Sequence, residues 1–224
     1  WVILLAAAQA TMGWIMVKSG LNDDTRTWVS AYKLVYHLSL ATILLGILYN
    51  TYLHAQYGSQ PNDFGRVKDD MIFYISGGLL LTQIVLGGFM AGMRAGLIHN
   101  VWPIVADIQG FLDKFSVDAV DLKDYEGNVS VKAWVQLAHR STAILLVIVL
   151  IYLAKRYIKD HSLSVKALGV FLGVQYGLGV LTLVYAIDSI PLLYGSLHQL
   201  VAMGLVMCFL HLHYAVRLMH HSRL

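Results

Sequence analysis

The sequence has very little charge and almost no cysteine. Only 13% of its 224 residues are charged, 58% are hydrophobic, and the mean hydropathy is +0.63. Soluble domains carry about 25% charged residues, so the composition excludes an ordinary soluble domain. The single cysteine, Cys208, excludes a disulfide within the chain and any site built on paired cysteines. Nothing in the charge pattern suggests a nucleic-acid surface, and we expect no nucleic-acid partner.

Long apolar stretches take the place of charge. The hydrocarbon core of a bilayer needs about 20 mostly apolar residues per helix. Segments that meet this need are 1–17, 30–54, 71–93, 131–154, 165–187 and 191–216. We therefore predict an all-α integral membrane protein with six transmembrane helices, surrounded by membrane lipid. Because the chain begins at Trp1 inside an apolar stretch, we expect that it is processed, or that an upstream part belongs to another polypeptide or precedes this sequence.

Basic residues gather on one side of the predicted helices. Lys155, Arg156, Lys159 and Lys166 crowd into one short connection. The positive-inside rule places this connection, the 55–70 loop and the 219–224 tail in the cytoplasm or matrix. The long loop 94–130 then lies on the outer side.

A repeat is hidden in the spans. The first, third and fifth spans each carry a glutamine four residues before a glycine, which places both on one helix face. These pairs are Gln9 and Gly13, Gln83 and Gly87, and Gln175 and Gly179. The second, fourth and sixth spans each carry one histidine about seven to nine residues into the helix, at roughly 10–13 Å below the outer surface. These histidines are His37, His139 and His198.

Histidines at one depth on different membrane helices are typical of a haem iron bound from both faces. We predict that His139 and His198 are its axial ligands. Arg140 follows His139 directly, and Arg94 lies at the outer end of the third span. Each arginine either reaches the outer interface or pairs with a haem propionate. His99, at the start of the outer loop, is a further functional candidate.

Several stretches resemble the haem A synthase family, whose members oxidise the methyl group of haem O to the formyl group of haem A. The stretches are GWIMVKSGL (13–21), VSAYKLVYHLSL (29–40), GGFMAGMRAGLIHNVWP (87–103), VQLAHR (135–140) and LHQL (197–200). The resemblance implies an eight-helix bundle in two pseudo-twofold halves, of which this chain matches helices three to eight. Residues 1–54 would be a helix pair of the N-terminal half, 55–70 an inner loop, 71–218 the C-terminal haem-binding half, and 219–224 an inner tail.

The resemblance also implies roles for the histidines. His139 and His198 would hold a b-type haem, whereas His37 would be a ligand in the N-terminal half, where haem O or haem A sits. The family's other N-terminal histidine and a glutamate thought to be catalytic lie in the first two helices, which this chain lacks. We therefore assign no catalytic residue, and we expect a separate chain to supply those helices.

The sequence leaves more than one function open. The leading interpretation is a haem A synthase, or the larger part of a split one, serving cytochrome c oxidase assembly in the mitochondrial inner membrane or a bacterial inner membrane. The alternative is a non-catalytic b-haem protein that transfers electrons or supports a respiratory complex, with that complex or oxidase assembly proteins as partners. An unrelated quinol- or ascorbate-linked cytochrome would place its histidine pairs near opposite faces of the membrane. A structural membrane protein without cofactor would leave the three matched histidines unexplained.

Overall fold

The computed structural model describes residues 1–20, 29–58, 70–115 and 128–221, and its long elements are all helices. The long helices are α1 (Val2–Lys18), α2 (Ala31–Tyr57), α3 (Asp70–Gly92), α5 (Val129–Tyr157), α6 (Ser162–Val184) and α7 (Leu192–His221). Short helical turns after α3 are η1 (Ala95–Leu97), η2 (Ile104–Asp107), α4 (Ile108–Leu112) and η3 (Asp113–Phe115). Most of the predicted inner loop, the end of the outer loop and the last three residues of the tail lie outside the described residues.

Within the described ranges, five helices are long and apolar enough to cross a membrane: α2, α3, α5, α6 and α7. Helix α1 is equally apolar but has 17 residues. The predicted all-helical fold with about six long helices is therefore confirmed, and the protein is a multi-pass membrane protein.

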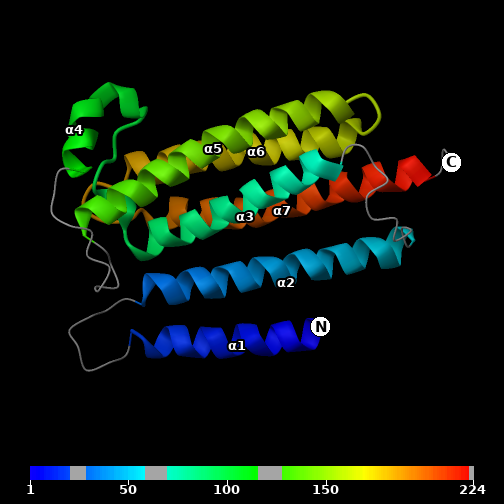
Figure 1. The fold of residues 1–224 in the computed structure, drawn as a ribbon, viewed down its shortest axis with the longest axis horizontal. Coiled ribbons are helices and arrows are strands. Elements are labelled where there is room, and N and C mark those ends of the chain that lie inside the picture. Colours follow the sequence, from blue (N-terminus) through cyan, green and yellow to red (C-terminus); the bar gives the residue numbers. More distant parts are fainter. Residues whose placement is uncertain (21–28, 59–69, 116–127, 222–224) are drawn as a thin grey trace.

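The long helices run side by side (Figure 1). Their contacts group them into three neighbouring pairs. The pairs are α1 with α2, α3 with α5, and α6 with α7, which are the units of the sequence repeat. Helices α3, α5, α6 and α7 form a four-helix bundle in which α5 and α7 are diagonal, because each packs on both α3 and α6. Helix α2 lies against α3 and α7, and α1 lies at the edge against α2.

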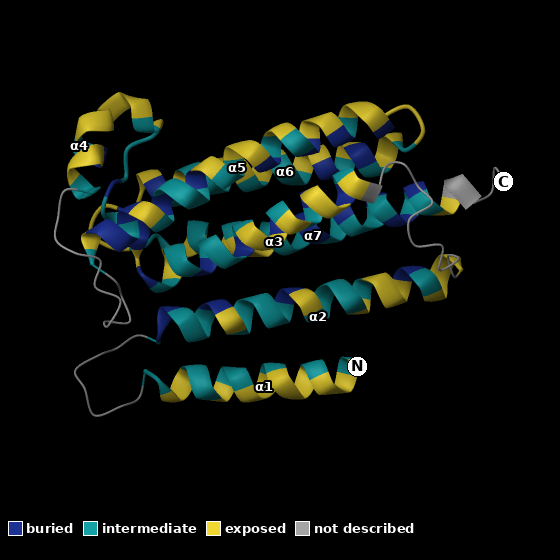
Figure 2. Ribbon diagram, viewed as in Figure 1, coloured by how far each residue is buried: buried dark blue, intermediate teal, exposed yellow. Residues whose placement is uncertain are grey.

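One end of the bundle is tightly packed. We call the end with the α5–α6 connection (158–161) the inner end, and the end with connections 93–103 and 185–191 the outer end. Buried side chains from all four bundle helices meet towards the inner end, among them Phe73, Leu153, Leu168 and Phe209. Helix α1, by contrast, has no buried residue (Figure 2). The dense inner core leaves the outer half of the bundle free to hold a cavity.

Small residues let α2 approach α3 closely. An ideal Cβ atom built on Gly92 would lie 2.7 Å from the Cα atom of Ala31, and one on Gly88 would lie 2.9 Å from Val35. Real Cβ atoms do not come this close to another heavy atom, and the neighbour of Gly92 is backbone, so glycine at position 92 is required for this helix crossing. The contact fixes the helix that carries His37 against the four-helix bundle.

Candidate functional site

The repeat gives each of its three histidines the same neighbour. In every unit the side-chain amide of the glutamine lies within hydrogen-bond distance of the histidine ring. The pairs, with the distance from the glutamine Nε2 to the nearest ring nitrogen, are Gln9–His37 at 3.3 Å, Gln83–His139 at 3.1 Å and Gln175–His198 at 3.3 Å. Glutamine therefore orients the imidazole of its own helix pair.

The glycine of each unit faces the imidazole. At Gly13 and Gly179 a larger residue would crowd the ring, whereas at Gly87 an added Cβ atom would make an ordinary contact. An ideal Cβ atom built on the glycine would meet the Cε1 atom of the histidine in the same unit. The separations would be 3.0 Å for Gly13 and His37, 3.5 Å for Gly87 and His139, and 2.9 Å for Gly179 and His198. The repeat is thus a seat for an imidazole, in which the glutamine holds one edge of the ring and the glycine leaves space for another.

The seat of His198 fixes which ring nitrogen carries the proton. Its Nδ1 lies 3.0 Å from the backbone oxygen of Gln175. A carbonyl oxygen can only accept a hydrogen bond, so Nδ1 carries the hydrogen. The lone pair of Nε2 then faces the side-chain amide of Gln175 at 3.3 Å. An imidazole that donates from one nitrogen to a carbonyl and offers the other is the usual arrangement of a metal-ligating histidine.

The seat of His139 is fixed by a third side chain. The hydroxyl of Thr142 donates to the Oε1 atom of Gln83 at 2.7 Å, so the amide Nε2 of Gln83 faces His139. The corresponding oxygens of Gln9 and Gln175 are buried and have no partner among the described residues. Sequence reasoning missed Thr142, although its position one helical turn after His139 was a usable signal.

His139 and His198 line one cavity of about 540 Å³ in the outer half of the four-helix bundle. They reach it from the diagonal helices α5 and α7. Most of the other lining side chains are apolar. Arg140 also lines the cavity, and its lining contains no lysine, aspartate or glutamate among the described residues. Pockets for cofactor-sized ligands typically measure about 300–1,000 Å³. The structure therefore brings together the two histidines that the sequence paired.

The sequence offered two alternatives for Arg140, the outer interface or a haem propionate. In the structure Arg140 does not reach the outer interface. Its side chain is 6% exposed and folds over the bundle. Its guanidinium donates to the backbone oxygens of His99 at 2.9 Å and Val101 at 3.2 Å. Burial and these two bonds exclude snorkelling, whereas pairing with a propionate stays a prediction. Among the described residues no carboxylate neutralises this buried charge.

Gln136, which sequence reasoning overlooked, shares this task. It lies one helical turn before Arg140 and is fully buried. Its side-chain amide donates to the backbone oxygens of His99 at 2.9 Å and Ala95 at 3.2 Å. The segment held in this way, residues 95–103, contributes Gly96 and Trp102 to the cavity wall. A polar pair on α5 thus holds the outer cover of the cavity.

Replacing Gln136 with leucine should loosen this cover. Leucine has a similar size but cannot donate, so the backbone oxygens of Ala95 and His99 each lose one donor. An unsatisfied buried polar group lowers the free energy of unfolding by about 1–3 kcal/mol. We expect a lower midpoint of thermal unfolding and faster cleavage by trypsin after the exposed Arg94. Gln109→Leu is the matched control, because Gln109 is exposed and its side chain, among the described residues, bonds only to Asp113. Equal midpoints and cleavage rates in both variants would contradict the assigned role.

His99 belongs to the cover but does not line the cavity. Its side chain is buried against Phe111, with ring centroids 5.1 Å apart, and its Nδ1 lies 3.8 Å from the Oδ2 atom of Asp107. Burial lowers the pKa of His99, the charge of Arg140 lowers it further, and Asp107 opposes both. The ring is therefore neutral in the folded protein at neutral pH.

This lowered pKa predicts a pH-dependent stability. Below the ordinary pKa of about 6.5 the unfolded chain binds a proton at His99 that the folded chain does not, so acid favours unfolding. The contribution of His99 is complete above about pH 6.5 and is lost as the pH falls towards the lowered folded value. We expect His99→Gln to reduce the fall in unfolding midpoint between about pH 7.5 and pH 5.5. An unchanged fall would assign the pH dependence to other groups.

The remaining two candidates lie away from the cavity. Arg94 is exposed, with its backbone at φ 52°, and it does not line the cavity. This left-handed residue ends α3 and turns the chain into the cover. His37 is half-buried on α2 in its own seat and is likewise absent from the cavity wall. Binding of a cofactor by either residue stays a prediction.

Comparison with known proteins identifies relatives along nearly the whole chain. The cytochrome oxidase assembly protein family matches residues 1–210. Haem A synthase of Flavobacterium johnsoniae is 34% identical over 213 residues, which cover 92% of this chain and 60% of the relative. Haem A synthase of Paramagnetospirillum magneticum is 34% identical over 231 residues, which cover 95% and 59%. That of Ehrlichia canis is 30% identical over 222 residues, which cover 97% and 60%.

The chain thus spans about 60% of the length of these curated relatives. No solved structure matches it. The relatives named above are bacterial, so the predicted mitochondrial location stays a prediction. Identity of about a third along nearly the whole chain, together with the family match, confirms the resemblance found in the sequence: the chain belongs to the family of cytochrome oxidase assembly proteins.

Proposed function

We propose that this chain is the larger part of a haem A synthase, which oxidises the methyl group of haem O to the formyl group of haem A for cytochrome c oxidase. The observation that carries the proposal is the cavity lined by His139 and His198 in a chain whose relatives are named haem A synthases. Because the chain spans about 60% of those relatives, the complete enzyme needs further helices, either on a separate chain or upstream.

The residues around the cavity fit a b-type haem. Its volume and apolar lining suit a large flat ligand. The Nε2 atom of His198 carries the lone pair that would bind iron once the amide of Gln175, 3.3 Å away, gives way, and His139 lies on the diagonal helix. The buried charge of Arg140, which no described carboxylate neutralises, suits an anionic propionate. His139 and His198 would hold this haem, which would supply one-electron transfer.

The protein's own contribution is to orient the two histidines and to cover the outer wall of the cavity. The backbone of Gln175 keeps the proton of His198 on Nδ1, and Thr142 keeps the amide of Gln83 directed at His139. Gln136 and Arg140 hold segment 95–103 against the outer wall, which limits the entry of water. Dry surroundings and fixed ligands are the means by which a protein sets the potential of such a group.

We place the substrate, haem O, at His37. This histidine repeats the seat of the other two, with Gln9 at its ring and Gly13 beneath it. Its other ring nitrogen, Nδ1, is buried and has no partner among the described residues. In this proposal the helices outside this chain supply the opposing ligand and the catalytic group, and oxidase assembly proteins in the inner membrane of a mitochondrion or bacterium receive the product.

One observation favours a second function. His139 and His198 share a cavity, whereas His37 does not line it. A chain with one complete bis-histidine site would serve as a b-haem subunit for electron transfer or structural support in a respiratory complex.

The haem content of the native complex tests both functions. The protein would be purified without added haem, its haem typed by pyridine haemochrome spectra and mass spectrometry, and every co-purifying chain identified. Haem b together with haem O or haem A, and a partner that supplies two helices, would support the synthase. Haem b alone without such a partner would support the second function. The absence of a Soret band would contradict both.

A further inference from the structure

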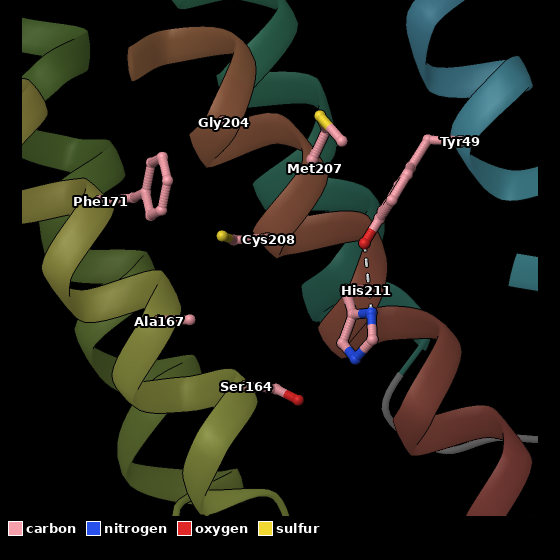
Figure 3. Close-up of a pocket in the computed structure, with 8 residues that line it drawn as sticks. All are labelled: Tyr49, Ser164, Ala167, Phe171, Gly204, Met207, Cys208 and His211. Atoms are coloured by element: carbon pink, nitrogen blue, oxygen red, sulfur yellow. Dashed lines mark hydrogen bonds between the residues drawn. The ribbon is translucent and has the colours of Figure 1, made fainter. Parts of the chain in front are cut away.

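A second cavity lies near the inner end of the bundle, away from the histidine seats. It has a volume of about 310 Å³ and is lined by α2, α6 and α7 (Figure 3). His211 on its wall follows His198 by thirteen residues on α7, which corresponds to about 20 Å along the helix axis. This cavity is therefore separate from the proposed haem site.

We propose that this second cavity binds the head group of a membrane quinone. The cavity lies among helices that cross the membrane, and its wall is mainly apolar. A ligand would therefore enter from the bilayer rather than from water. A ring with neutral oxygen substituents, carried on an apolar tail, has the polarity that this wall accepts.

The shape of the cavity comes from small residues on two helices. Gly204 and Cys208 line the cavity from α7, and Ala167 lines it from α6 (Figure 3). The ring of Phe171 lies against Gly204, closer than any side chain there would allow. Tyr49 of α2 closes the opposite side. The volume is near the lower limit of ligand pockets, about 300 Å³, which suits a single ring but not a haem.

A hydrogen-bonded pair supplies the polar contact. The hydroxyl of Tyr49 lies 3.2 Å from the Nδ1 atom of His211 (Figure 3). Because a phenol is a better proton donor than a neutral imidazole, Tyr49 donates and the hydrogen of His211 sits on Nε2. No described residue accepts a hydrogen bond from this Nε2 atom. It is therefore free to donate to a quinone oxygen, and the hydroxyl of Ser164 lies on the α6 wall for the second one.

The same wall disfavours a phospholipid. None of the eight lining residues is a lysine, an arginine or an acid. A phosphate head group would therefore lose its water without gaining a fixed counter-charge. A neutral quinone loses much less, because its carbonyl oxygens are satisfied by single donors.

Photolabelling of the purified full chain tests the proposal. The probe is a benzoquinone with a ten-carbon tail and a photoreactive azide, added to the protein in detergent. We expect saturable binding, with the label on peptides of α6 and α7. Tyr49→Phe, which removes one oxygen atom, and His211→Leu should each weaken binding about tenfold, as loss of one hydrogen bond predicts. Ala167→Leu should abolish binding by filling the cavity.

The matched control is Tyr52→Phe. Tyr52 is exposed on the same helix and stacks on Tyr49, with ring centroids 6.1 Å apart, but it does not line the cavity. Circular dichroism identifies any variant that fails to fold. If His211→Leu and Ala167→Leu fail to fold, the comparison of probe affinity between Tyr49→Phe and Tyr52→Phe decides the test. Equal affinity in these two, labelling elsewhere, or displacement of the probe by phospholipid would each overturn the proposal. Quinone binding does not depend on haem, so its failure would leave the proposed synthase function standing.

Discussion

Replacing His198 with alanine is expected to remove the low-spin b-type spectrum from the purified protein completely. The variant loses an axial ligand whose proton is already fixed by the backbone of Gln175, and no other described histidine lines the cavity except His139. His139→Ala should have the same effect from the diagonal helix. The measurement is the optical and electron paramagnetic resonance spectrum, with haem content per chain.

Two controls separate ligation from folding. His54→Ala changes a histidine on α2 that packs against Tyr214, with ring centroids 5.3 Å apart, and lines neither cavity, so the spectrum should persist. His198→Gly should regain the low-spin spectrum when imidazole is added, because imidazole can occupy the vacated seat. If His139→Ala and His198→Ala both keep the spectrum, the axial assignment is wrong.

Replacing His37 with alanine is expected to abolish conversion of haem O while sparing the spectrum of the His139–His198 site. The two effects separate because His37 lies in its own seat on α2 and does not line the four-helix cavity. The measurement is the ratio of haem A to haem O in membranes that contain the complete complex, alongside the low-spin spectrum.

The control for this variant lies one residue away. Tyr36 is 64% exposed on the same helix, so Tyr36→Phe should leave both the conversion and the spectrum unchanged. Gln9→Leu, which removes the neighbour of the His37 ring, should lower the conversion less than His37→Ala does. Normal conversion in His37→Ala would show that His37 only packs.

Local repetition made the imidazole seats predictable. Gln83, Gly87 and His139 fall at spacings that one helix pair can bring together, so the sequence pattern contains the contact. The apolar lengths of the spans likewise predicted the all-helical membrane fold, because a bilayer demands them. Among the long helices that the structure describes, α1, with 17 residues, is the one below the usual length.

The outer cover could not be predicted in the same way. Arg140 and Gln136 bond to backbone oxygens about forty residues earlier in the chain, and a backbone acceptor has no signature in the sequence. Helical periodicity places both side chains on one face of α5 but does not say what that face meets. The Tyr49–His211 pair is hidden for a similar reason, because its members are 162 residues apart and outside the repeat.

The pairing of helices has a consequence for how the protein is made. Each histidine is oriented by a glutamine from its own helix pair, and α6 and α7 are joined by only the short connection 185–191. A hairpin leaving the translocon can therefore orient its histidine before it meets any other hairpin. The cavity, however, exists only once the α3–α5 and α6–α7 hairpins have come together. In the proposed function, a haem can therefore be bound from both sides only after these two hairpins have met.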